Sequence, residues 1–101
     1  MMISTKIRKL RMNFNLSQVE LAKHLGVTKQ CVSNWENDNI LPSVDMLIKL
    51  SKFFNVSTDY LLDLSNQINI DVSGLNDTEI AHIKLLIKDF QNLRVKEKIK
   101  V

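Results

Sequence analysis

Apolar residues recur at three- and four-residue spacing along the chain, in short stretches that polar turns separate. Ile3, Ile7, Leu10 and Phe14 show this spacing, and they predict an amphipathic helix that ends near Asn13. Four more short helices are predicted by the same periodicity; they begin after Ser17, after Thr28, at Pro42-Ser43 and at Thr58, and the last ends at Leu62. The pattern therefore predicts five short helices packed as one domain over residues 1–62.

The second and third predicted helices lie close together in sequence and carry clear signals at their ends. Ser17 and Glu20 have the spacing of a capping box, in which a hydroxyl and a carboxylate each satisfy a free backbone amide. Gly26 suits the left-handed backbone that ends the second helix, and Thr28 suits the start of the third. Because two helices joined by so short a turn cross steeply, residues 17–37 are predicted to form a helix-turn-helix.

A polar linker and one long helix follow the five-helix domain. Residues 63–75 are predicted as the linker, and Asn76 with Glu79 marks the start of a helix over residues 76–101. The helix carries an apolar stripe that consists of Ile80, Ile83, Leu86, Ile87, Phe90 and Leu93. So wide an apolar face is unsatisfied on an isolated helix in water. We favour dimerisation with the same helix of a second copy; folding back onto the five-helix domain and binding a partner protein are the alternatives.

Composition supports an all-α protein and excludes several other classes. Two glycines and one proline are too few for the many tight turns of an all-β fold. The single cysteine, Cys31, excludes an internal disulfide, and neither His24 nor His82 belongs to a cluster with metal-ligand spacing. The first residues lack the apolar core of a signal peptide, and lysines interrupt the apolar runs. We therefore expect a cytoplasmic protein with no metal, no cofactor and no membrane association.

Charge is distributed unevenly along the chain. Residues 1–37 contain six basic and two acidic residues, a net charge of +4. The remaining residues contain eight basic and nine acidic residues, a net charge of −1. A basic half joined to a nearly neutral half is typical of a small protein with a nucleic-acid-binding face.

From about Ile7 to Leu62 the chain resembles the Cro/CI-like (XRE-type) helix-turn-helix regulators of bacteria and their phages. The matching segments are Leu16-Ser17-Gln18, Glu20-Leu21-Ala22, Leu25-Gly26-Val27, Val32-Ser33, Trp35-Glu36-Asn37, Pro42-Ser43, Leu47, Phe54-Asn55-Val56-Ser57 and Tyr60-Leu61-Leu62. The resemblance implies a five-helix, lambda-repressor-like fold and a sequence-specific DNA-binding transcriptional regulator, in most cases a repressor. It does not extend to the tail that follows Leu62.

Carried over position by position, the resemblance implies roles for residues around the third helix. The residues expected to contact base edges in the major groove are Lys29, Gln30, Ser33 and Asn34. Their chemistry agrees, because lysine donates to guanine while glutamine and asparagine pair bidentately with adenine. The residues expected to contact phosphate are Gln18, Thr28 and Asn37, with Lys9 and Lys23 as further candidates. Arg11 and Glu36 match a structural ion pair between the first and third helices.

Two positions depart from the family pattern. Asp38 stands where most members have glycine, but Asn37 and Asp38 both tolerate the left-handed backbone, so the turn is expected to survive. The following loop is Asn39-Ile40-Leu41, where relatives often carry lysine or arginine. The resemblance therefore carries no DNA contact over to this loop.

The resemblance also predicts the partners of this chain. We expect a homodimer on a pseudo-palindromic operator of double-stranded DNA, with half-sites roughly 34 Å apart. An antitoxin, with a toxin or another antagonist protein bound to the tail, is the first alternative, and a protein-interaction module without DNA binding is the second. The sequence contains no paired carboxylates, nucleophile–base arrangement or phosphate-binding loop, so we do not expect an enzyme.

Overall fold

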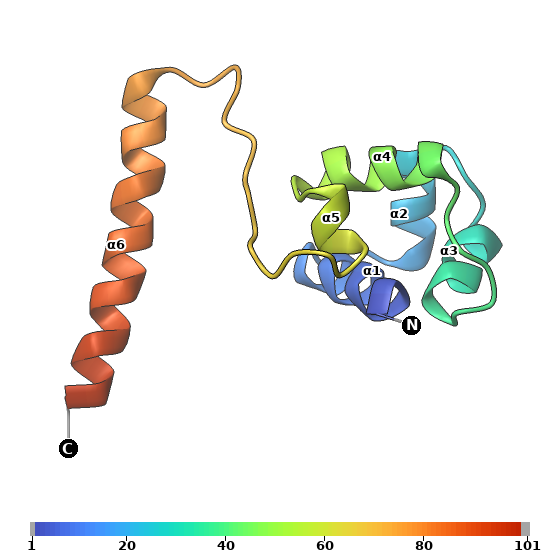
Figure 1. The fold of residues 1–101 in the computed structure, drawn as a ribbon, viewed down its shortest axis with the longest axis horizontal. Coiled ribbons are helices and arrows are strands. Elements are labelled where there is room, and N and C mark those ends of the chain that lie inside the picture. Colours follow the sequence, from blue (N-terminus) through green and yellow to red (C-terminus); the bar gives the residue numbers. More distant parts are fainter. Residues whose placement is uncertain (1, 100–101) are drawn as a thin grey trace. The chain divides into compact units, whose positions relative to one another are not determined.

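The computed structural model describes residues 2–99, and within that range the chain forms six α-helices and no strand. The helices are α1 (Met2–Asn13), α2 (Gln18–Leu25), α3 (Lys29–Glu36), α4 (Val44–Phe54), α5 (Thr58–Leu61) and α6 (Asp77–Ile99) (Figure 1). This confirms the all-α fold predicted from the sequence. The chain divides into two compact units, residues 1–71 with α1 to α5 and residues 72–101 with α6.

Helices α2 to α5 each begin at a hydroxyl side chain that accepts a hydrogen bond from an amide of the first turn. The four capping residues are Ser17, Thr28, Ser43 and Ser57. The capping box predicted for α2 is complete, because Ser17 accepts from the Glu20 amide and Glu20 accepts from the Ser17 amide. Local sequence thus fixes where these short helices start.

Left-handed residues end several of the helices. Gly26 at φ 72° ends α2, and Asn55 at φ 56° ends α4. Asp38 adopts φ 61° after α3. The turn after the third helix therefore survives without glycine, as the sequence predicted, because a short polar side chain tolerates this backbone region.

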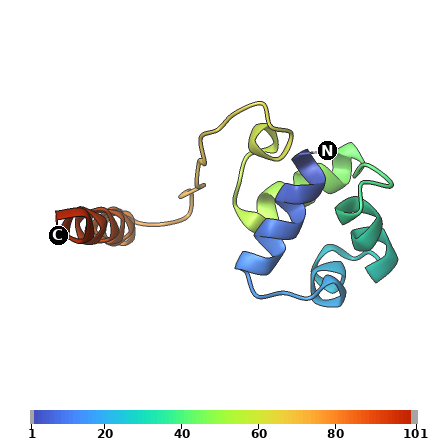
Figure 2. The same ribbon diagram turned by 90° about the horizontal axis from the view of Figure 1, so that it is seen from below.

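The core of the first unit receives one fully buried aliphatic side chain from each of its five helices. These side chains are Ile7, Leu21, Val32, Leu50 and Leu61. Figure 2 shows the same five helices turned by 90°, gathered around a common centre. Each fully buried aliphatic side chain contributes about 1.5–3 kcal/mol to folding. No single helix of this unit buries its apolar face without the others.

Phe14 is less buried than its predicted inward position implies. It lies just beyond the last residue of α1, at the margin of the core, although its amide still donates to the Leu10 carbonyl at 3.0 Å. Its side chain is 48% exposed, and its ring meets the edge of Phe54 at a centroid distance of 5.0 Å. The Phe53 ring lies 6.0 Å away, centroid to centroid, so Phe14 contacts two aromatic rings while about half of it stays exposed.

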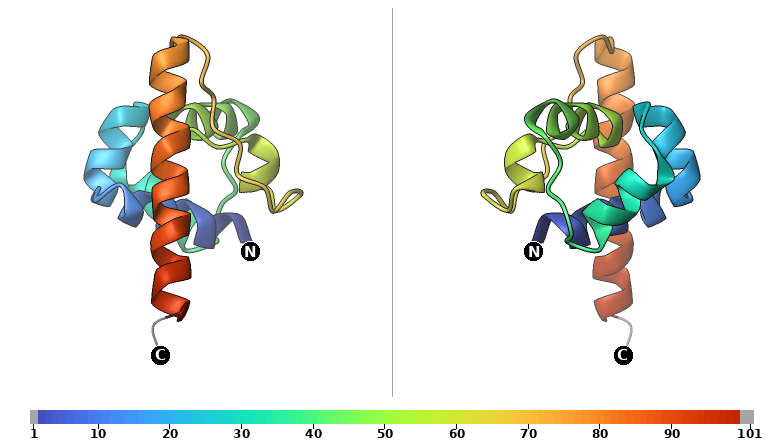
Figure 3. Two further views of the ribbon diagram at one scale, coloured as in Figure 1. Left: turned by 90° about the vertical axis from the view of Figure 1, so that its left-hand side faces the viewer. Right: turned by 90° about the vertical axis from the view of Figure 1, so that its right-hand side faces the viewer.

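The second unit contains one uninterrupted helix, α6, over Asp77–Ile99 (Figure 3). Asn76 and Glu79 cap its start reciprocally, with amide-to-side-chain distances of 2.8 and 3.0 Å. The apolar residues of α6 lie mostly in solvent within this unit; the exposed ones are Leu85, Leu86, Ile87, Phe90 and Leu93, while Ile80 and Ile83 are half-buried. None of the described helices is long and apolar enough to cross a membrane.

Candidate nucleic-acid interface

The turn between α2 and α3 holds the two helices against a shared core. The Val27 amide donates to the Ala22 carbonyl at 2.9 Å, which closes the turn directly after Gly26. Leu21 and Ala22 on α2 and Trp35 on α3 are buried together with the core residues. The inner face of α3 is thus committed to packing, and its polar outer face is left for solvent or a ligand.

The four residues predicted to contact bases lie on α3 and are partly or fully exposed. Lys29 and Gln30 are exposed, whereas Ser33 and Asn34 are half-buried. Hydrogen bonds link neighbouring turns: Gln30 Nε2 donates to Asn34 Oδ1 at 3.0 Å, and Asn37 Nδ2 donates to Ser33 Oγ at 3.2 Å. One bond joins two of the four predicted base contacts, Gln30 and Asn34, and the other joins Ser33 to Asn37, the residue that caps the end of α3.

The carboxylate of Glu36 joins the end of α3 to α1 and α2. Its side chain is fully buried and accepts hydrogen bonds from three residues. Arg11 Nε donates to Oε2 at 2.6 Å and Arg11 Nη2 to Oε1 at 3.0 Å. Gln18 Nε2 and Arg8 Nε reach Oε1 at 3.2 and 3.4 Å. The ion pair of Arg11 with Glu36 therefore lies inside a larger network.

The electrostatics of this network keep Glu36 ionised. Burial by itself raises the pKa of the carboxyl group. The hydrogen bonds and charge of Arg11, together with Gln18 and Arg8, outweigh burial and lower the pKa of Glu36 below its ordinary value. A buried charge with such partners fixes the orientation of α3, because moving the helix would leave the carboxylate without its donors.

The residues predicted to contact phosphate are distributed over three helices. Gln18 begins α2 and gives one N–H to Glu36, and Thr28 Oγ1 accepts from the Cys31 amide at 3.2 Å as the cap of α3. Lys9 on α1 and Lys23 on α2 are exposed, and no hydrogen bond within the described residues joins either of them to the outer face of α3. Gln18 therefore donates to Glu36, and Asn37, the next residue along the chain after Glu36, accepts from Arg8 of the same network. Neither Lys9 nor Lys23 is among the described residues that donate to the Glu36 carboxylate.

Sequence reasoning missed the contribution of Arg8. Arg8 Nη2 lies 3.4 Å from Asn37 Oδ1 and 3.5 Å from the Glu36 carbonyl oxygen, so it contacts the C-terminal end of α3. The available signal was its position three residues before Arg11, which places both guanidinium groups on one face of α1.

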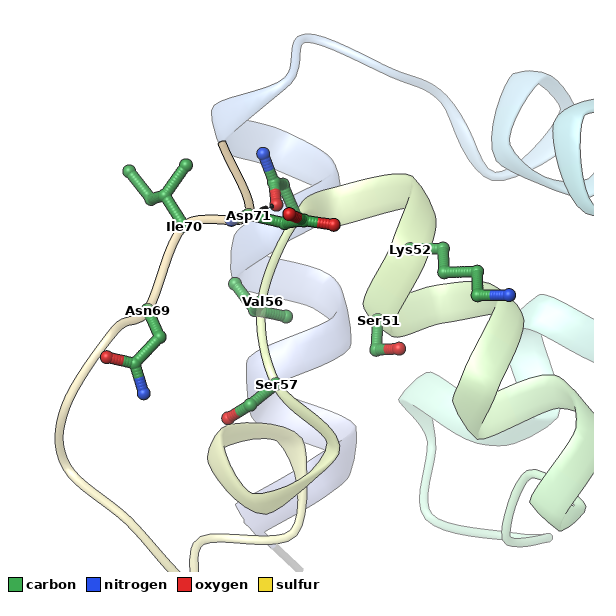
Figure 4. A pocket seen from close by; sticks show the side chains of 8 residues that line it. Ser51, Lys52, Val56, Ser57, Asn69, Ile70 and Asp71 are labelled. Atoms are coloured by element: carbon green, nitrogen blue, oxygen red, sulfur yellow. Dashed lines mark hydrogen bonds between the residues drawn. The ribbon is translucent and has the colours of Figure 1, made fainter. Parts of the chain in front are cut away.

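A second feature of the first unit is a cavity of about 440 Å³ between the α4–α5 corner and the segment that follows α5. Figure 4 shows its walls, which consist of Ser51, Lys52, Val56 and Ser57 on one side and Asn69 and Ile70 on the other. The Asp71 amide donates to Asn55 Oδ1 at 2.9 Å and holds the segment in place. Nothing in the local sequence pattern predicted this contact.

Comparison with known proteins gives a consistent result. A helix-turn-helix family matches residues 7–61. The transcriptional regulator ImmR of Bacillus subtilis (strain 168) is 33% identical over 94 residues, which are 93% of this chain and 69% of that protein. Repressor protein C2 of Salmonella phage P22 is 37% identical over 71 residues, or 68% of this chain and 32% of that protein.

Solved structures show the same likeness in three dimensions. The P22 c2 repressor in complex with a synthetic operator has a TM-score of 0.58 at 33% identity, and the match covers 60% of this chain and 92% of that one. A complex of SinR with SinI has a TM-score of 0.60 at 26% identity, and covers 96% of this chain and 95% of that one. The first likeness covers about three fifths of this chain, and the second extends over nearly all of it.

Proposed function

Because this chain belongs to the Cro/CI-like helix-turn-helix family of transcriptional regulators, we propose that it represses a promoter by sequence-specific binding to double-stranded DNA. The family match over residues 7–61 confirms the resemblance that the sequence predicted from about Ile7 to Leu62. The observation that carries the proposal is the outer face of α3, which is polar and partly exposed while the buried Glu36 network holds its inner side. A rigid helix with such a face has the form that the major groove accepts.

The proposed base contacts are Lys29, Gln30, Ser33 and Asn34. They stand on successive turns of one short helix, so a single placement in the groove brings all of them near base edges. Lys29 donates to guanine acceptors, and the amides of Gln30 and Asn34 suit adenine. Ser33 accepts from Asn37, which leaves its hydroxyl hydrogen to donate to a base.

The proposed phosphate contacts are Gln18, Thr28 and Asn37, with Lys9 and Lys23. Gln18 and Thr28 lie at the starts of α2 and α3, where free backbone amides favour anions. The positive charge of residues 1–37 supports the same assignment. Binding through these contacts is expected to weaken as salt rises, because cations are released from DNA when phosphates are neutralised.

We further propose that the chain acts as a homodimer in the cytoplasm, on a pseudo-palindromic operator, with the α6 helices paired through their apolar faces. The exposed side chains of α6 support this, since they remain in solvent within their own unit. The likeness to P22 c2 on its operator supports DNA as the ligand. An antagonist or toxin protein bound to α6 is the second candidate, and the likeness to SinR in complex with SinI favours it.

Selection from a random duplex-DNA library at physiological salt tests the proposal. The unchanged chain is expected to enrich a pseudo-palindrome. A variant in which Gln30, Ser33 and Asn34 are all alanine is the matched control, since it keeps the core and the Glu36 network. It is expected to fold and to enrich nothing. If the unchanged chain folds and enriches no sequence, the proposed function is wrong, and a protein partner of α6 becomes the leading candidate.

A further inference from the structure

Gln30 and Asn34 form one hydrogen-bonded unit on the outer face of α3. Their side chains lie four residues apart, which places them on adjacent turns of the same helical face. Gln30 Nε2 donates to Asn34 Oδ1 at 3.0 Å. Gln30 is exposed and its side chain is one methylene longer, whereas Asn34 is half-buried. The two amides therefore stand in different positions with respect to any ligand of this face.

The chemistry of a primary amide separates their roles. Reading adenine bidentately requires one amide to accept from the N6 amino group and to donate to N7 at the same time. In a primary amide, the oxygen and the hydrogen on the same side form the edge that pairs with adenine. The other amide hydrogen points away from that edge, so a hydrogen bond through it leaves the adenine-pairing edge complete. Gln30 donates one N–H to Asn34, and its oxygen and second N–H remain available for a base. The oxygen of Asn34 accepts the hydrogen bond from Gln30, and its side chain is half-buried.

Resting on the proposed function and narrowing its set of base contacts, we propose that Gln30 reads an adenine in each half-site and that Asn34 positions Gln30 instead of reading a base itself. A free glutamine side chain loses rotamer freedom when it binds a base. The hydrogen bond to Asn34 restricts that freedom before DNA arrives, so less is lost on binding. In this arrangement Gln30 determines the base preference, and Asn34 contributes to the affinity by holding Gln30 in place.

The test measures binding and base preference for wild type, Gln30→Ala, Gln30→Glu and Asn34→Ala against the operator that the wild type selects, with all four bases at each position of a half-site. Gln67→Ala is the matched control, an exposed glutamine outside the helices that undergoes the same change. Gln30→Ala is expected to reduce a preference of at least tenfold for one A·T pair to less than twofold. Gln30→Glu is expected to move the preference at that pair towards cytosine, whose amino group a carboxylate accepts.

Asn34→Ala is expected to keep the adenine preference at that position and to weaken binding about three- to tenfold. A double-mutant cycle separates positioning from a merely structural role. In the Gln30→Ala background, Asn34→Ala is expected to change binding less than twofold, because no glutamine remains to be positioned. A structural role would give the same loss in both backgrounds.

Three outcomes overturn the inference, and they differ from one another. If the unchanged chain selects no operator, the proposed function fails and the inference fails with it. If the wild type selects an operator but Gln30→Ala selects the same one with the same preference, Gln30 is not the reader while the function stands. If Asn34→Ala removes the adenine preference and Gln30→Ala does not, the roles of the two residues are reversed.

Discussion

Glu36 is the residue at which α1, α2 and α3 meet. Its buried carboxylate accepts from Arg11, Gln18 and Arg8, and these donors lie on the two helices that flank α3. Removing one partner of a buried ion pair is costly, because the other charge stays buried without compensation. The network therefore explains how the C-terminal end of α3 is held against α1 and α2.

Glu36→Gln is expected to lower the free energy of unfolding at neutral pH by about 3 kcal/mol. The pKa of Glu36 is lowered from its ordinary value of 4.5, so the ionised carboxylate stabilises the folded state. That contribution is fully present above pH 4.5 and is lost as pH falls through the lower pKa of the folded state. Urea denaturation from pH 7 to pH 3 is expected to show the wild-type and variant stabilities converging below pH 4.5.

Glu79→Gln is the control for this comparison, because Glu79 lies on α6, outside the five-helix unit. For this variant, the free energy of unfolding of residues 1–71 is expected to change with pH in parallel with that of the wild type. A constant difference in the free energy of unfolding between wild type and Glu36→Gln across the whole pH range would contradict the assigned role of the Glu36 charge.

Asn15 tests backbone strain at a single residue. It adopts φ 56° between α1 and α2, in the left-handed region that costs most residues about 1–2 kcal/mol. Asn15→Gly is expected to leave the melting temperature unchanged or raise it, whereas Asn15→Ala is expected to lower it by about 4–8 °C per kcal/mol lost. Thermal unfolding followed by circular dichroism measures both. Equal melting temperatures for the two variants would show that this turn relaxes.

At the scale of the helices, the sequence predicts the elements well because their signals are local. The start of α2 follows from Ser17 and Glu20 alone, and the end of α2 follows from Gly26. α5 ends at Leu61, one residue before the predicted Leu62. The predicted base-contacting residues share one helix for the same reason, since helical periodicity places them on neighbouring turns.

Contacts between distant residues are what the sequence does not predict. The bond from the Asp71 amide to Asn55 joins residues sixteen positions apart, and a polar stretch gives no periodic signal for it. The contact of Arg8 with Asn37 spans 29 residues and depends on how α1 and α3 pack. Such contacts are decided by tertiary packing, which a pattern of apolar positions specifies only in outline.

Asn55 links α4 to the segment that follows α5, and its variants separate two of its properties. Asn55→Gly keeps the left-handed backbone and removes the acceptor of the Asp71 amide, while Asn55→Asp keeps an acceptor oxygen. Hydrogen exchange at the Asp71 amide is expected to accelerate in Asn55→Gly and to change little in Asn55→Asp. Unchanged exchange in Asn55→Gly would show that this hydrogen bond does not protect the amide.

At the scale of the whole molecule, the uneven charge distribution predicts how binding depends on salt. Each phosphate contact contributes about 0.9 to the slope of log K against log salt concentration on duplex DNA. Lys9→Ala and Lys23→Ala are each expected to reduce the slope by about one and to weaken binding evenly across sequences. Lys49→Ala is the matched control, an exposed lysine on α4 outside the basic part of the chain. If the slope is unchanged in Lys9→Ala, Lys9 does not contact phosphate.

The proposed dimer gives a prediction for the second unit. Its 23-residue helix is about 35 Å long and exposes Leu86, Ile87 and Phe90 within its own unit. Burying Phe90 in each of two subunits contributes about 3–6 kcal/mol in total. Phe90→Asp is therefore expected to weaken self-association at least a hundredfold, because it also places a charge in the apolar face. Sedimentation equilibrium measures the change.

Gln91→Asp is the matched control, since it introduces the same charge at the adjacent, exposed position of α6 and is expected to remain dimeric. The DNA measurement then separates dimerisation from readout. A monomeric Phe90→Asp variant keeps α3 intact, so it is expected to prefer the same half-site sequence as the wild type with lower affinity for the full operator. If Phe90→Asp instead stays dimeric, the apolar face of α6 is not the contact between copies. A protein antagonist then becomes the better candidate for the partner that covers it.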